Sequence, residues 1–139
     1  MDVVGILIVS HGAFGESLIH SASHVLSKRP PLVRQLGVTV HDDPEAILPQ
    51  GRDLVEQLDR GKGVLVFTDI LGATPSNIAT RLLVPGKVEG VSGVNLPMLI
   101  RALTYREEAL AEVVAKAISG GQAGVVHMTT DTCNGANRS

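Results

Sequence analysis

Two side chains in this sequence could do chemistry together. His11 follows an almost continuously apolar run, residues 3–9, and Gly12 after it leaves the approach to the ring open. Asp69 follows a second apolar run, residues 64–67. An imidazole can act as a base, a metal ligand or a nucleophile. Nucleophilic use requires one ring nitrogen to be free and the other to be held by an acceptor, and Asp69 is the candidate acceptor.

The turn after Asp69 has the composition of a phosphate-binding helix start. Thr74 followed by Pro75 is typical of an N-cap and a proline in the first helical position. Gly72 lets the backbone approach a ligand closely, and the N–H groups of a helix N-terminus attract phosphate. We therefore expect Gly72 and Thr74 to hold a phosphoryl group near His11. Two simpler interpretations stay open: a histidine that only closes a strand, and a Thr-Pro pair that only starts a helix.

The other histidines and the single cysteine give weaker signals. His20 and His24 have the spacing of two metal ligands on a helix, but no Glu follows His20 and no third ligand is evident, so we expect a solvated helix face. His127 lies in the last predicted strand. Cys133 is alone, which excludes an intrachain disulfide and a cysteine-based zinc site. We expect no metal and no cofactor.

The elements that must position these residues alternate along the chain. Short apolar runs predict strands, and stretches with a helical period separate them, which is typical of parallel pairing in a layered α/β fold. The carboxyl ends of such strands meet at one edge, so His11 and Asp69 should meet if the first and third strands are neighbours. The predicted strands cover residues 3–9, 33–40, 64–67, 88–94 and 124–128, and the last long helical stretch, 97–119, should break near Tyr105 and Arg106.

Composition limits the class of protein. The chain has 139 residues, enough for one domain, and 12 basic against 14 acidic residues give a net charge of −2. With 2% aromatic residues, neither the charge nor the stacking side chains of a nucleic-acid-binding surface are present. The apolar runs are too short for a membrane span, and no signal peptide is recognisable. We expect a cytoplasmic protein with one domain over residues 1–128 and a polar tail over 129–139.

Three sequence blocks, taken together, resemble a known family. They cover residues 6–12, residues 64–77 and residues 93–99, and include Ser10-His11-Gly12, Asp69 and Gly72-Ala73-Thr74-Pro75. In order and spacing they resemble the IIA component of the mannose-type sugar phosphotransferase system, over residues 1 to about 128.

The resemblance implies a phosphoryl relay and a fold to support it. In this family the phosphocarrier protein HPr phosphorylates the histidine that matches His11, and a IIB protein then receives the group. The carboxylate matching Asp69 orients that histidine, and the hydroxyl matching Thr74 lies near the phosphoryl group. The implied fold is a doubly wound, mostly parallel sheet sandwiched by helices. Members are typically homodimers whose C-terminal strand, here residues 124–128, crosses to the partner.

Two departures from the family pattern leave alternatives open. After the aspartate, relatives often carry an aromatic residue and a Gly-Gly pair where this chain has Ile70-Leu71-Gly72-Ala73, which predicts an altered partner surface. Well-known transporters also fuse a IIB domain, so here IIB would act in trans. The alternatives are a regulatory module in which phosphorylation of His11 reports carbon or nitrogen status, and the related subunit that serves dihydroxyacetone kinase.

Overall fold

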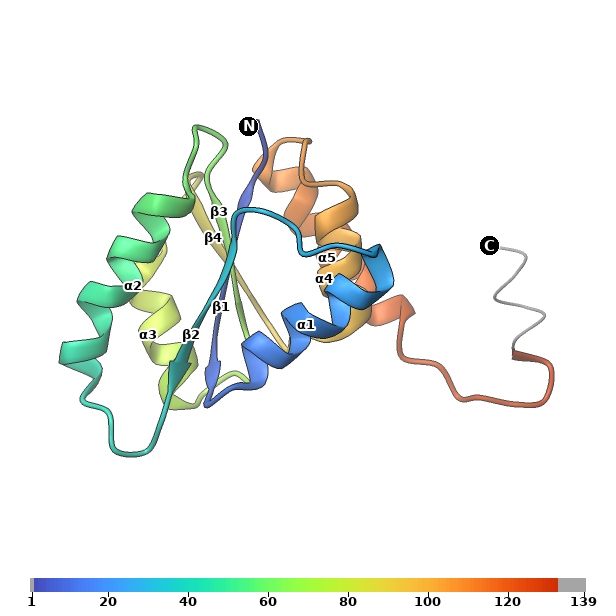
Figure 1. Cartoon of the computed structure of the whole chain (residues 1–139), viewed down its shortest axis with the longest axis horizontal. Helices are drawn as coiled ribbons and strands as arrows, with labels where there is room; N and C mark the ends of the chain where they lie inside the picture. The colour runs from blue at the N-terminus through green and yellow to red at the C-terminus, as the bar shows by residue number, and fades with distance from the viewer. Residues whose placement is uncertain (1, 133–139) are drawn as a thin grey trace.

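The protein, described by a computed structural model over residues 2–132, is a four-stranded parallel sheet between two layers of helices (Figure 1). This confirms the predicted α/β fold. The sheet order is β2-β1-β3-β4. The elements in chain order are β1 (Gly5–His11), α1 (Phe14–Leu26), β2 (Val33–Val38), α2 (Pro44–Leu58), β3 (Val64–Thr68), α3 (Thr74–Leu82), β4 (Val88–Ser92), α4 (Leu96–Thr104) and α5 (Leu110–Ala123).

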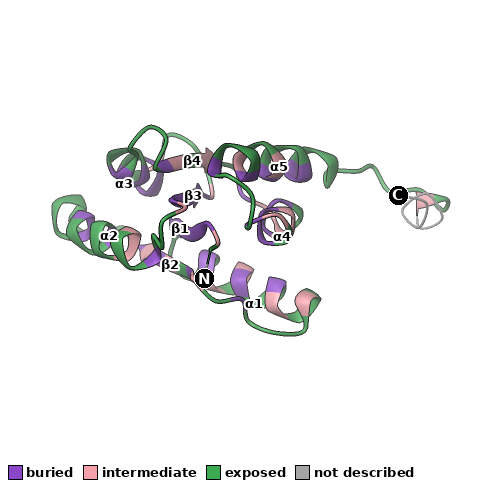
Figure 2. Cartoon of the chain, turned by 90° about the horizontal axis from the view of Figure 1, so that it is seen from above, coloured by how far each residue is buried: buried purple, intermediate pink, exposed green. Residues whose placement is uncertain are grey.

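The helices cover the sheet in two groups, because alternate residues of each central strand face opposite layers. Ile6 and Ile8 of β1 pack with α1, α4 and α5, whereas Leu7 and Val9 pack with α2 and α3. Figure 2 shows these two groups of helices on either side of the sheet. All four side chains are fully buried. Burial on both faces explains why the central strands read as continuous apolar runs in the sequence.

The structure confirms one sequence prediction for the C-terminal part of the chain and contradicts another. The break near Tyr105 and Arg106 is confirmed, since α4 ends at Thr104 and α5 begins at Leu110. The predicted strand over residues 124–128 is wrong for a single chain. These residues form no ladder with β4 or any other described strand, and they extend away from the sheet and its helices (Figure 1).

No helix within residues 2–132 is long and apolar enough to cross a bilayer.

A buried arginine ties the amino-terminal ends of two strands together. Arg106 is 7% exposed, and its guanidinium donates four hydrogen bonds to three backbone carbonyl groups. Nε and Nη2 reach Val4 O at 3.1 and 2.8 Å, Nη1 reaches Pro31 O at 2.6 Å, and Nη2 also reaches Leu32 O at 2.9 Å. Because Val4 precedes β1 and the other two acceptors precede β2, one side chain fixes where both strands enter the sheet.

Replacing Arg106 with methionine should destabilise the fold. Three carbonyl groups would lose the guanidinium as a donor, although Leu32 O would keep the N–H of Ile6, and we expect the free energy of unfolding to fall by about 3 kcal/mol. Urea denaturation measures this change. Arg52→Met, at an exposed position of α2, is the matched control and should change the stability little. Equal effects of the two substitutions would contradict the role given to Arg106.

Candidate active site at the carboxyl edge of the sheet

The structure brings His11 and Asp69 together at the topological switch point of the sheet, where the strand order reverses. β1 and β3 are neighbours, and the chain leaves them in opposite directions, from β1 through α1 to β2 and from β3 through α3 to β4. In open parallel sheets the crevice outside such a pair of strand ends is the usual binding position. His11 is the last residue of β1, and Asp69 is the first residue after β3.

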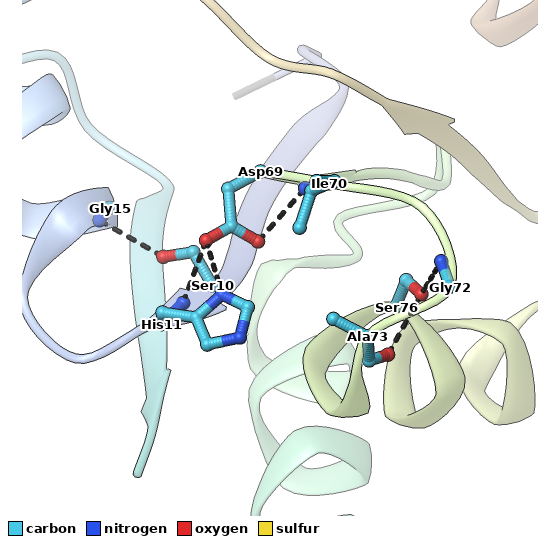
Figure 3. A network of polar contacts seen from close by, with 8 residues as sticks. All are labelled: Ser10, His11, Gly15, Asp69, Ile70, Gly72, Ala73 and Ser76. Carbon is cyan, nitrogen blue, oxygen red and sulfur yellow. Dashed lines mark hydrogen bonds and ion pairs between the residues drawn. The ribbon is translucent and has the colours of Figure 1, made fainter. Parts of the chain in front are cut away.

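The Asp69 carboxylate holds His11 by both its backbone and its ring (Figure 3). Oδ2 accepts from the His11 backbone N–H at 3.0 Å and lies 2.7 Å from His11 Nδ1. Oδ1 accepts from the backbone N–H of Ile70 at 3.0 Å. The acceptor at Nδ1 favours the tautomer that carries its proton there, which leaves Nε2 with its lone pair.

Asp69 is held in its ionised form. Its partial burial alone would raise the pKa, but the hydrogen bonds from the backbone and ring of His11, with that from Ile70, outweigh this and lower the pKa below 3.8. The Asp69 side chain is 15% exposed, whereas the ring of His11 is 52% exposed. The site therefore pairs a sheltered anion with an imidazole that a visiting molecule can reach.

The backbone turns sharply directly after β1. Gly12 has φ +52°, in the left-handed region that favours glycine. Ser10, fully buried, accepts from the N–H of Gly15 through Oγ at 3.0 Å. This bond joins the end of β1 to the first turn of α1. Sequence reasoning missed Ser10, although a polar residue ending an apolar run was a visible signal.

The turn after Asp69 differs from its sequence prediction. Thr74 is not the N-cap of α3: Ala73 occupies that position, without a side-chain cap, and Thr74 is the first helical residue. The backbone groups of this turn are instead hydrogen-bonded by Ser76, which lies within α3. Its Oγ accepts from the N–H of Gly72 at 2.8 Å and donates to Ala73 O at 2.9 Å (Figure 3). Gly72, with φ +91°, permits this turn. Sequence reasoning had not assigned Ser76 a role.

Two of the helices that start at this edge have no side-chain cap. α2 and α4 are capped by Asp43 and Asn95, whereas α1 and α3, which follow His11 and Asp69, have no capping side chain. The backbone N–H groups at an uncapped helix start are donors without an intrahelical acceptor. Those of α3, and those of α1 other than the Gly15 N–H that Ser10 accepts, border the site and give it a capacity for anions.

The remaining histidines take no part in this arrangement. The rings of His20 and His24 lie edge to face on exposed positions of α1, with centroids 4.9 Å apart. Among residues 2–132, no group of three or more His, Cys, Asp or Glu side chains is placed to hold a metal ion. Cys133 lies outside the described residues.

A family model matches most of the chain. It is the EIIA-man model, described as the fructose IIA component of the phosphotransferase system, and it matches residues 5–119. The mannose-specific EIIAB component of the phosphotransferase system from Escherichia coli (strain K12) is 31% identical over 125 residues, covering 88% of this chain and 38% of that protein. The chain thus spans less than half the length of this relative.

Solved structures of similar proteins have the same fold. The phosphotransferase system component EIIA from Streptococcus agalactiae superposes with a TM-score of 0.78 at 27% identity, covering 89% of this chain and 96% of that one. The phosphotransferase-system IIA protein associated with the fucose utilization operon of Streptococcus pneumoniae superposes with a TM-score of 0.75 at 28% identity, covering 91% of this chain and 96% of that one. The mannose/sorbose-specific IIA subunit from Enterococcus faecalis superposes with a TM-score of 0.81 at 22% identity, covering 91% of this chain and 96% of that one. At this identity the similarity supports the fold alone.

The lowered pKa of Asp69 makes part of the stability depend on pH. Because folding favours the ionised carboxylate, its stabilisation is complete above the ordinary value of 3.8 and is lost as pH falls through the lower folded pKa. Asp69→Asn should cost about 1–2 kcal/mol of unfolding free energy at pH 7, and the deficit should shrink in acid below pH 3.8. Denaturation at a series of pH values measures it. Asp53→Asn, on the exposed side of α2, is the control, and a deficit independent of pH would contradict the ionised pairing.

Proposed function

The chain belongs to the EIIA-man family of phosphotransferase-system IIA components, and from this membership we propose that His11 carries a phosphoryl group from phosphorylated HPr to a IIB protein in sugar uptake. The family supports phosphoryl transfer within a sugar phosphotransferase system. The observation that carries the assignment to His11 is its exposed ring, held 2.7 Å from Asp69 through Nδ1, while Nε2 makes no hydrogen bond to any residue within 2–132.

The proposed reaction is an in-line displacement between two imidazoles. The lone pair of His11 Nε2 forms a bond to phosphorus while the P–N bond of the donor histidine breaks, and its electron pair returns to the donor ring. The phosphorylated ring keeps its proton on Nδ1 and carries positive charge. The ionised Asp69, hydrogen-bonded to that nitrogen, stabilises this charge and keeps the ring from turning. The activated P–N bond of the donor supplies the driving force.

The arriving phosphoryl group brings up to about two negative charges close to Asp69. The backbone N–H groups at the starts of α1 and α3 can offset these charges. Gly72 and Thr74 remain the proposed phosphate-binding residues. Thr74, at the first position of α3, is exposed and makes no capping bond, so its hydroxyl and backbone N–H are available to an incoming oxygen. The N–H of Gly72 is engaged by Ser76 in the unphosphorylated protein, so its contribution requires that this bond be exchanged.

The surroundings of His11 suit a protein partner. Phe14, Ile70 and Leu71 follow the two functional residues in sequence and are 41, 57 and 76% exposed. Apolar side chains beside an open polar site are typical of the centre of a protein–protein contact. HPr and IIB would each cover this surface in turn. The family pattern after the aspartate often carries an aromatic residue and a Gly-Gly pair where this chain has Ile70-Leu71-Gly72-Ala73, so partner choice is expected to depend on this segment.

Phosphoryl transfer from HPr tests the assignment. Incubation with radiolabelled phospho-HPr should label the wild-type protein and His20→Ala equally, whereas His11→Ala should take up no label. Asp69→Asn should still be labelled, but about tenfold or more slowly, because the ring loses its ionised partner. Phosphorus and nitrogen NMR should place the group on Nε2. Labelling of His11→Ala, or attachment at Nδ1, would overturn the proposal.

We also propose that two copies associate through residues 124–128. Val125, Val126 and Met128 are 78, 57 and 78% exposed, and β4 is an edge strand whose outer side pairs with no described strand. An apolar extended segment and an open edge are complementary.

Light scattering after gel filtration tests this association. The wild type should be a dimer, and Val126→Glu/Met128→Glu, which changes two residues on one face of an extended segment, should give monomers. Thr129→Glu/Thr130→Glu, beyond the segment, is the charge-matched control and should remain dimeric. A monomeric wild type, or a dimer that survives the first pair of changes, would contradict the proposal.

A further inference from the structure

A separate hollow lies at the opposite end of the sheet from His11. It has a volume of about 410 Å³ and lies where α1 and α4 end and where the chain enters β1 and β2. Its walls are mostly apolar, formed by Val3, Leu26, Pro30, Pro31 and Leu103. This volume is within the range of small-molecule sites, and the phosphoryl transfer proposed above makes no use of it.

The polar group in this hollow is the guanidinium of Arg106. The residue is 7% exposed, and no carboxylate among residues 2–132 lies within ion-pair distance of it. Backbone carbonyls receive four of its five N–H groups, and one N–H of Nη1 has no partner among the described residues. Burial lowers the pKa of Arg106 to about 10, so the group stays charged at neutral pH. A buried cation without a counter-ion favours an anion beside it.

The other charges that line the hollow are compatible with the binding of such an anion. Lys28 stands on its rim as a second cation, and Glu107 is the single carboxylate-bearing residue among those that line it. The carbonyl ends of α1 and α4 also point to this edge and offset part of the positive charge. Direct contact with the guanidinium would therefore select the ligand. A carboxylate can accept from the unengaged N–H of Nη1, and this hydrogen bond is strengthened because both partners are charged.

We propose that this hollow binds a small aliphatic carboxylate, with its carboxylate on Arg106 and Lys28 and its hydrocarbon part against Leu26, Pro30 and Leu103. The walls provide the affinity through apolar contact, and the guanidinium provides the selection for an acid over a neutral molecule. Because the hollow and His11 lie at opposite ends of β1, the ligand leaves the phosphoryl-transfer surface uncovered. The site is suited to an effector of the protein and not to a substrate of the relay.

Hexanoate, hexan-1-ol and acetate are the probes, with the full chain labelled with ¹⁵N and observed by amide NMR. Hexanoate should produce saturable shifts at the amides of Val3, Lys28, Thr104 and Glu107. Hexan-1-ol has the same chain without charge and should bind about tenfold more weakly. Acetate has the charge without the chain and should be weaker still. Equal affinity for hexanoate and hexan-1-ol, or no saturation by about 10 mM hexanoate, would overturn the proposal.

Variants of the rim test the site without disturbing the fold. Arg106 itself is unsuitable, because its loss destabilises the protein. Lys28→Glu, at an exposed position, should weaken hexanoate binding about fivefold. Lys87→Glu makes the same change of net charge at an exposed position before β4, outside this hollow, and should leave the affinity unchanged. The proposal is wrong if the two variants weaken binding equally or if Lys28→Glu has no effect.

Discussion

One oxygen atom, Asp69 Oδ2, fixes both the main chain and the ring of His11 across the two central strands. The contact is possible because β1 and β3 are parallel neighbours, paired as far as Val9 and Thr68, so that His11, two residues after Val9, and Asp69, directly after Thr68, lie at the same edge. The orientation of the imidazole, the ionisation of the carboxylate and the start of α3 just beyond it all follow from this pairing. A different strand order would separate these groups and leave no site.

The two edges of the sheet are chemically opposite. α1 to α4 all begin at the carboxyl edge, so N–H groups collect there, and they end at the amino edge, where carbonyl groups collect. The structure places the exposed ring of His11 at the first edge and the buried Arg106 at the second. The direction in which the helices run therefore places helix N–H groups at the edge that is proposed to receive a phosphoryl group.

The sequence was most informative where local pattern and tertiary structure agree. Buried parallel strands show as apolar runs, so the run at residues 64–67 located β3 closely. That His11 would lie beside Asp69 depended on strand order, which the pattern alone did not determine.

Three features required the folded chain. The carbonyls held by Arg106 include one 102 residues away in sequence, a separation no local pattern reveals. Thr74-Pro75 resembles a capped helix start, but Ser76 takes over the turn and moves Thr74 into the helix. The apolar run at residues 124–128 has strand character but finds no strand to pair with in its own chain.

The main-chain N–H of His11 has a consequence for variants at this position. Because that N–H, and not only the ring, binds Asp69, any residue other than proline at position 11 retains one of the two links between β1 and β3. If His11 carries the phosphoryl group as proposed above, a variant that cannot be phosphorylated would therefore keep its shape and its apolar surface. Produced beside the normal protein in a cell, it would occupy the same partners without passing anything on, and would act as a dominant inhibitor.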